Sequence, residues 1–235
     1  MSVNHEIKEQ RAKLKDAPFK EKLAYFWEYY KWQTIGGIGG LILLVFLVND
    51  IIKANRPIYM EGLYINAGLI DYETLQTEYA NVVGANEDET PLSITSMTVT
   101  TEYSSGDITG SYYDKQKLMA MIAAAEIDFF ISDEAVFLPY AKEETFLDLS
   151  ECFSEEELKQ WEDSLYTVTY VDGSSHIVGI DITSIPYLTD HLKYYQYLSK
   201  NDEGNDQVYF SIVCNSSRVD RAKDYFDYIS SYQAP

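Results

Sequence analysis

The chain has 235 residues and a formal net charge of −20, and it is rich in tyrosine, with 21 such residues. A chain this acidic repels polyphosphates, so we expect no nucleic-acid partner. Its aromatic content of 14% is typical of a packed domain and argues against disorder. Two cysteines, Cys152 and Cys214, are too few for a disulfide-built scaffold, and the sequence leaves open whether they pair.

Charge and hydropathy divide the chain in two. Residues 1–33 carry seven Lys/Arg against five acidic residues, whereas residues 54–235 carry ten against thirty-two. At the boundary, WQTIGGIGGLILLVFLVN (residues 32–49) has no formal charge, and as a helix it would span roughly 27 Å, close to the thickness of a bilayer core. The pattern predicts a transmembrane helix over residues 33–53 and a linker over residues 54–57.

The charge asymmetry also predicts an orientation. Short basic flanks stay in the cytoplasm, while acidic domains translocate with little regard for charge. We therefore expect a single-pass protein of the cell membrane with a cytoplasmic N-terminus and an extracellular domain over residues 58–235. A cleaved signal peptide is the alternative, but VNDIIKANRP after the apolar segment has no A-x-A-like cleavage site.

Residues 1–32 are expected to form a basic, aromatic, helical region. Oppositely charged neighbours at helical spacing favour a helix over residues 6–15, and Pro18 suits the first turn of a second helix over residues 19–32. The second helix combines dense aromatic residues with lysines, which is typical of a membrane interface. A docking surface for a cytoplasmic partner is the alternative.

Inside the predicted span, Gly36 and Gly40 form a G-x-x-x-G motif. This spacing lets two membrane helices pack closely and is typical of helix dimers. Glycine is also common in membrane helices generally, so the motif leaves open whether the chain forms a homodimer through this helix.

After the linker, strand and helix patterns alternate. Strands are expected over residues 58–66, 92–103, 127–132, 146–149, 166–171, 176–182 and 208–215. Helices are expected over residues 71–82, 113–126, 133–142, 154–164, 190–199 and 218–231. The DGSS sequence between two of the strands indicates a hairpin. Strands separated by helices predict an α/β domain with a mostly parallel sheet sandwiched by helices.

Three stretches resemble parts of one protein family. KLMAMIAAAEIDFFISDEAVFLPYAKEETFLDLSE (residues 117–151) resembles the middle of the first lobe of bacterial extracellular solute-binding proteins of the type II class. YVDGSSHIVGIDI (residues 170–182) resembles the hairpin that precedes the crossing between their lobes. VYFSIVCNSSRVDRAKDYFDYI (residues 208–229) is similar to their returning strand and closing helix. The resemblance implies one lobe of such a protein and a small ligand.

The chain departs from that pattern in one respect. The family has a second lobe between the hairpin and the returning strand, but here only residues 183–207 fill the interval, too few for a core of their own. We expect a reduced second lobe. The basic aromatic helix, single span and acidic exterior also resemble membrane-anchored envelope proteins of Gram-positive bacteria, which implies location only.

No catalytic motif is found. The GGIGG sequence lies in the predicted span, no G-x-S-x-G elbow occurs, and His176 next to Ser174 and Ser175 indicates a polar hairpin turn rather than a triad. We therefore expect no enzyme, no cofactor and no metal site. A ligand would bind beyond the carboxyl ends of the strands. The polar or small residues expected there are Asn66, Gly68, Ser132, Asp133 and Asp181, although Asp133 equally suits a helix N-cap.

Two functions follow from these patterns. The first is a membrane-anchored binding module that recognises a small ligand or an envelope protein. The alternative is a non-catalytic scaffold of the cell envelope without a small-molecule ligand.

Overall fold

The computed structural model describes residues 18–67, 71–86, 90–99, 108–191 and 207–233. The chain divides into two compact units, Met1–Arg56 and Pro57–Pro235. The first unit contains the apolar helix and the second contains a six-stranded sheet with its helices.

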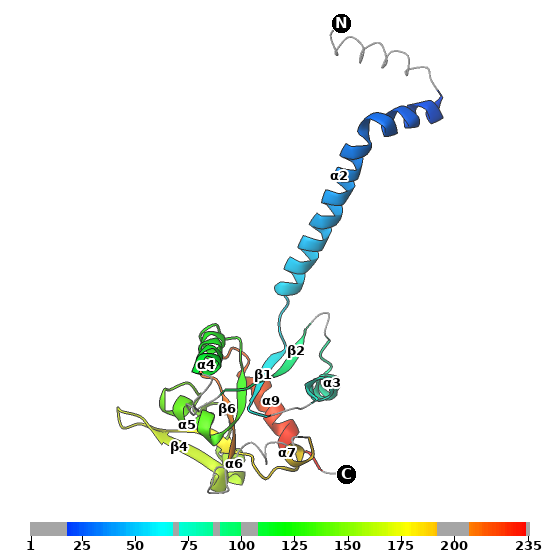
Figure 1. The fold of residues 1–235 in the computed structure, drawn as a ribbon. Helices are drawn as coiled ribbons and strands as arrows, with labels where there is room; N and C mark the ends of the chain where they lie inside the picture. The colour runs from blue at the N-terminus through cyan, green and yellow to red at the C-terminus, as the bar shows by residue number, and fades with distance from the viewer. Residues whose placement is uncertain (1–17, 68–70, 87–89, 100–107, 192–206, 234–235) are drawn as a thin grey trace. The chain divides into compact units, whose positions relative to one another are not determined.

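The first unit is dominated by one helix, α2 (Phe19–Ala54), of 36 residues. It joins the helix expected over residues 19–32 to the predicted span in a single element, with a bend in its dark-blue N-terminal part (Figure 1). Within its segment Tyr30–Lys53, an 18-residue window has a mean hydropathy of 2.2, and none of that window is buried inside the protein. This segment is therefore long and apolar enough to cross a membrane.

The second unit is built on a mixed sheet. Its strands are β1 (Met60–Ile65), β2 (Leu92–Met97), β3 (Phe129–Asp133), β4 (Leu165–Thr169), β5 (Ser175–Asp181) and β6 (Val208–Ile212). Their order across the sheet is β2-β1-β3-β6-β5-β4. The pairs β1–β2 and β1–β3 are parallel, whereas β3–β6, β5–β6 and β4–β5 are antiparallel. The expectation of a mostly parallel sheet is therefore wrong.

The error has a local cause. The VYFSI sequence of β6 is buried at every position, as a central strand is whether its neighbours run parallel or antiparallel. Strand β6 inserts antiparallel between β3 and β5 and carries the predicted β4–β5 hairpin with it. Burial thus identifies the strand but not its direction.

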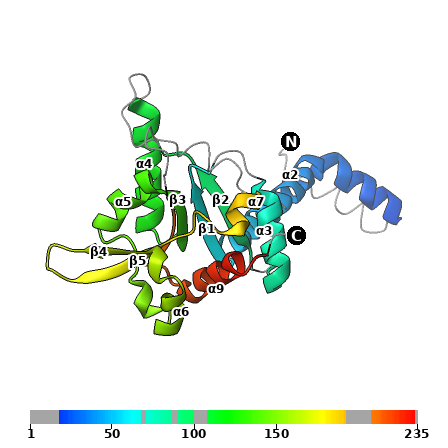
Figure 2. The same ribbon diagram turned by 90° about the horizontal axis from the view of Figure 1, so that it is seen from below.

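Helices cover both faces of the sheet (Figures 1 and 2). The main helices are α3 (Tyr72–Val83), α4 (Ile108–Ala123), α5 (Glu134–Lys142), α6 (Glu155–Gln160), α7 (Pro186–His191) and α9 (Val219–Ser230). Buried side chains of α3, α6, α7 and α9 join one apolar cluster, and those of α4 and α5 join the other. The sandwich of helices around the sheet is as expected.

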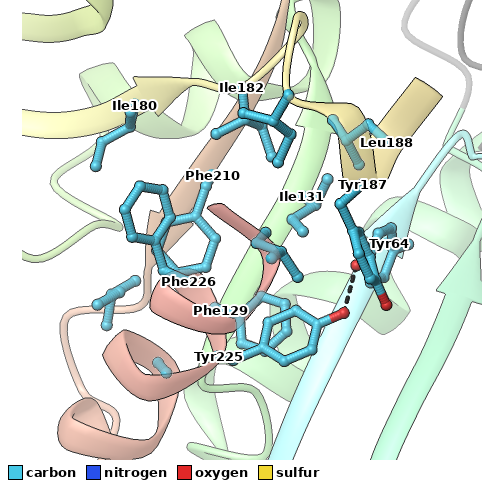
Figure 3. Packing of buried hydrophobic residues seen from close by; sticks show 14 of the residues in the cluster. Tyr64, Phe129, Ile131, Ile180, Ile182, Tyr187, Leu188, Phe210, Tyr225 and Phe226 are labelled. Atoms are coloured by element: carbon cyan, nitrogen blue, oxygen red, sulfur yellow. Dashed lines mark hydrogen bonds between the residues drawn. The ribbon is translucent and has the colours of Figure 1, made fainter. Parts of the chain in front are cut away.

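The first cluster is unusually rich in tyrosine (Figure 3). The Tyr64 hydroxyl from β1 forms a hydrogen bond with the Tyr225 hydroxyl from α9, and both residues are fully buried. The Tyr225 ring also stacks on Phe129, with 4.7 Å between ring centroids. Burial raises the pKa of both tyrosines well above the ordinary value, because an ionised phenol has no water there.

Several predicted local signals are present. Asp133 caps α5 by accepting from the Val136 amide at 2.9 Å, and Ser154 with Glu157 forms the capping box of α6. The expected helix over residues 154–164 is shorter, because α6 ends at Gln160 and a 3-10 turn, η2 (Glu162–Ser164), follows.

Other boundaries also differ from expectation, and the strand expected over residues 92–103 ends at Met97. The strand expected over residues 146–149 is reduced to a bridge between Phe146 and Val213, and the 3-10 helix η1 (Leu149–Glu151) follows it because Asp148 caps that turn. Helix α4 starts and ends earlier than expected. Only residues 190 and 191 of the helix expected over residues 190–199 are described, as the end of α7, and the rest lies outside the described residues.

A buried carboxylate joins the parallel and antiparallel halves of the sheet. Asp128, directly before β3, is fully buried, and its Oδ2 accepts from the Glu61 amide of β1 at 2.7 Å. The same oxygen accepts from Arg218 Nε at 2.8 Å, while Oδ1 accepts from Ser216 Oγ at 2.6 Å. Because Ser216 and Arg218 follow β6, this one side chain holds three neighbouring strands together.

Candidate functional site

The structure brings two of the predicted ligand-binding residues together. Asn66 follows β1 with φ of 59°, and its Nδ2 donates to Asp133 Oδ2 at 2.8 Å. The same amide group pairs with the backbone of Val99, accepting from its N–H at 2.8 Å and donating to its carbonyl at 3.0 Å. The polar atoms of Asn66 therefore brace the segment after β2, and Asp133 caps α5.

Asp181 lies at the same end of the sheet. It is in register with Tyr209, which is in register with Ser132 of β3. Asp181 Oδ1 accepts from the Thr183 amide at 2.9 Å and from the Thr183 hydroxyl, and that hydroxyl accepts from the Val208 amide at 2.8 Å. These bonds fix the turn after β5, so the carboxylate also has an internal role.

The remaining predicted residues add little to this end of the sheet. Ser132 is fully buried, and its hydroxyl has no hydrogen-bond partner among the described residues. Gly68 lies outside the described residues. Tyr209, which sequence patterns did not single out, donates to Gln207, and burial followed by the charge of Asp181 raises its pKa to about 12.

A serine, a histidine and an aspartate form a hydrogen-bonded chain on the β4–β5 hairpin. His176 Nε2 lies 2.8 Å from Ser174 Oγ, and His176 Nδ1 lies 2.8 Å from Asp148 Oδ2. The distances match those of a nucleophilic triad. However, Ser174 Oγ also donates to Asp172 at 2.7 Å, and the Ser174 amide donates to the same carboxylate at 2.9 Å.

These contacts indicate a structural role for the chain of polar groups. A serine hydroxyl has one proton, and in this turn it is directed to Asp172 rather than held for transfer to His176. The ring of Tyr170 packs on His176 at 5.1 Å, and Asp148 connects the hairpin to η1. The prediction of a polar hairpin turn agrees with this geometry. The contact with Asp148 was not predicted, because this residue lies 28 residues from His176 in the sequence.

The outer edge of β4 is unpaired among the described residues. Strand β4 is the last in the strand order, and its one described partner is β5. A surface depression of about 420 Å³ lies along this edge, lined by residues 166–171 and by Lys142 at the end of α5. Residues 164–171 (SLYTVTYV) carry no charge, although the domain as a whole is strongly acidic.

The opposite edge strand, β2, is partly closed. The backbone N–H of Ile94 donates to the side-chain oxygen of Gln76 at 3.1 Å, and Gln76 belongs to α3. Pro91 directly precedes the strand and its carbonyl accepts from the Tyr59 amide at 2.8 Å. Gln76 thus accepts the hydrogen bond of a backbone N–H that an added strand would need as a donor.

The described part of the chain was also searched for groups of metal ligands and for reactive cysteines. No group of three or more His, Cys, Asp or Glu residues there is arranged to hold a metal ion. Cys152 and Cys214 are free thiols, the first half-buried and the second exposed. Burial raises the pKa of Cys152 to about 11, which makes it a poor nucleophile at neutral pH.

Comparisons with protein-family models, with curated proteins and with solved structures found no match.

Proposed function

We propose that this chain is a membrane-anchored interaction module that binds a protein segment by strand addition at β4. The observation that carries the proposal is the uncharged outer edge of β4, with which no strand pairs among the described residues, together with its adjoining depression. Strand addition draws its affinity from main-chain hydrogen bonds and its specificity from depressions that receive alternate side chains. Both elements are available along residues 166–171.

The contrast between the sheet edges supports this assignment. Soluble proteins protect edge strands with charged residues, prolines or covering elements, because a bare edge pairs with other chains. Strand β2 (LSITSM) and residues 164–171 both lack charge and proline, but β2 has Gln76 on its outer side, where this side chain accepts from the Ile94 N–H. An edge left open in this way is suited to an intended partner.

The carboxyl end of the sheet gives less support for a small ligand. Asn66, Asp133 and Asp181 each use side-chain atoms to hold neighbouring backbone, so binding there would compete with those bonds. Recognition of a solute, and with it the likeness to one lobe of a solute-binding protein, stays a prediction. So does dimerisation through Gly36 and Gly40.

The anchor and the orientation belong to the same proposal. The exposed apolar face of α2 and the acidic excess of residues 54–235 favour a domain outside the cell. Cys214 offers a direct test, because it is an exposed thiol in the domain. A membrane-impermeant maleimide added to intact cells should label the wild-type chain and not Cys214→Ser. Labelling that requires cell lysis would contradict the orientation.

Strand addition is tested with a photo-reactive amino acid in the full-length chain. It replaces Thr169, an exposed residue of β4, or Thr95, an exposed residue of β2, as the matched control. We expect discrete protein adducts from position 169 and few from position 95, because Gln76 shields the edge at β2 and no strand pairs with the edge at β4 within the described part of the chain. Equal adducts from both positions, or none from position 169, would overturn the proposal.

A further inference from the structure

A segment that begins in β4 has the same sequence in either direction, and its last residue, Tyr170, directly follows the strand. Residues 166–170 are Tyr-Thr-Val-Thr-Tyr, centred on Val168. When two copies of such a strand pair antiparallel about a two-fold axis, each residue faces the residue at the mirrored position. An axis through Val168 therefore sets Tyr166 against Tyr170, Thr167 against Thr169, and Val168 against itself.

We infer that the partner of the β4 edge is a second copy of this chain, joined strand to strand about that axis. The inference rests on the proposed function and names the partner for the same edge. Pairing through β4 would continue the six-stranded sheet of one copy into that of the other. Each copy presents the same surface, as the interface of a two-fold dimer requires.

The facing side chains are of kinds that stabilise antiparallel strands. Aromatic pairs and threonine pairs directly opposite each other each contribute roughly 0.2–1 kcal/mol relative to alanine pairs. Tyr166, Val168 and Tyr170 all belong to or pack against the apolar cluster beneath α5. In the two-fold arrangement these three side chains form a continuous row with those of the partner, while Thr167 and Thr169 meet on the other face.

Charge also favours this edge for self-association. Residues 54–235 carry ten Lys/Arg against thirty-two acidic residues, so two copies repel each other over most of their surfaces. Residues 164–171 have no charge, and the charged residue that lines the adjoining depression is Lys142. Two acidic domains thus meet here without setting like charges directly opposite each other.

The size of the contact sets its strength. An edge pairing of five residues per copy is smaller than the about 1,200–2,000 Å² of a stable complex. Confinement of both copies to one membrane raises their effective concentration and compensates for a weak contact. We therefore expect the pairing in membranes and its loss when the chain is diluted in detergent.

The register is tested by cysteine cross-linking of the full-length chain in its membrane, with Cys152→Ser and Cys214→Ser as the background. Val168→Cys places one thiol on the axis, where the Cα atoms of a facing pair are about 4.5–5.5 Å apart, within reach of a disulfide. Thr167→Cys alone or Thr169→Cys alone is displaced by two residues, about 7–8 Å from its counterpart. We expect at least about tenfold more disulfide dimer from Val168→Cys than from either flanking variant.

A second combination serves if Val168→Cys does not fold, because Val168 is buried. Chains with Thr167→Cys and chains with Thr169→Cys, differently tagged and co-expressed, should form the mixed disulfide in preference to either homodimer. Both residues are exposed in β4, so folding is retained. A mixed disulfide no more than about twice as abundant as each homodimer, which is the ratio that random pairing gives, would overturn the register.

A charge pair provides the matched control. Thr167→Lys with Thr169→Lys sets like charges opposite each other and should reduce the Val168→Cys cross-link at least several-fold. Thr167→Lys with Thr169→Glu sets opposite charges against each other and should restore it. Equal loss in both double variants would overturn the two-fold pairing.

The two proposals fail separately. Photo-adducts from position 169 with a mass other than two copies, together with no Val168→Cys disulfide, would refute the second copy and leave strand addition standing. No adduct of any mass from position 169 would refute both.

Discussion

The two edges of the sheet meet solvent in different ways, although they belong to one sheet. At β2, Gln76 from α3 accepts from the outward N–H of Ile94, and the strand passes into a segment held by Asn66. At β4, one side of the strand pairs with β5, and residues 164–171 contain neither a charge nor a proline. Side chains of neighbouring elements, and not the position of a strand in the sheet, therefore determine whether an edge strand is shielded.

Both edges belong to one continuous sheet, and Asp128→Ala is the substitution that should disrupt this sheet most. The substitution removes the carboxylate that joins β1, β3 and the segment after β6, and leaves Arg218 without its partner. Loss of one member of a buried ion pair costs about 3–5 kcal/mol. Denaturant unfolding followed by circular dichroism measures it. Glu126→Ala, an exposed acidic neighbour, is the control, and equal effects of the two would contradict the assignment.

Two glycines allow the halves of the sheet to be compared directly. A Cβ on Gly62 of β1 would lie 2.2 Å from the Phe129 ring, whereas one on Gly179 of β5 would lie 2.7 Å from the Phe137 ring. Overpacking a core costs about 1–3 kcal/mol, so Gly62→Ala should destabilise at the upper end and Gly179→Ala by less. Thermal unfolding of the two variants compares them. A larger destabilisation by Gly179→Ala than by Gly62→Ala would show that packing around β5 tolerates an added methyl group less well than packing around β1.

Opening the β2 edge should make it resemble β4. Gln76→Leu removes the acceptor of the Ile94 N–H, and a buried donor without a partner costs about 1–3 kcal/mol. We expect a loss near 1 kcal/mol, because this hydrogen bond is only partly buried. We also expect new photo-adducts from position 95. Gln116→Leu, on the exposed surface of α4, is the control and should produce no adducts there.

The smallest effect is expected at the Asp148–His176 hydrogen bond, which holds the β4–β5 hairpin to η1. Burial raises the pKa of Asp148, but hydrogen bonds from Ser150 and His176 outweigh it, so the net shift is downward. This stabilisation is therefore present above the ordinary value of 3.8 and lost as the pH falls through the lower folded value. His176→Ala should cost roughly 0.5–1 kcal/mol at pH 7, because the pair is partly exposed.

Amide hydrogen exchange measures the local stability that this hydrogen bond gives to the hairpin. Amides of residues 165–181 should exchange faster in His176→Ala than in the wild type, with little change in β1 and β3. The wild type should approach the variant as the pH falls below about 4. Uniform acceleration across the whole sheet would mean that the hairpin has no separate stability.

The sequence is sufficient for features that depend on neighbours along the chain. The uncharged stretch within Tyr30–Lys53 predicts the apolar helix, the spacing of Ser154 and Glu157 predicts a capping box, and Asp133 before an apolar helix predicts its N-cap. Each of these depends on residues within a few positions of one another. Their physical causes are complete in a short window of sequence.

Features set by distant residues were not predicted. The direction of β6 depends on which strands flank it, and its apolar sequence is compatible with both directions. Asp128 has its partners 67, 88 and 90 residues away, so nothing near it distinguishes it from other acidic residues. The open edge at β4 becomes apparent only when the strand order shows that this uncharged segment lies last.

The lack of any charge along residues 164–171 also has a practical consequence for producing the protein. Short uncharged segments of high strand propensity stack into fibrillar aggregates when their concentration is high. Over-expression without the membrane anchor should therefore give thioflavin-positive deposits, and a single lysine in place of Thr169 should act as a gatekeeper that keeps the chain in solution.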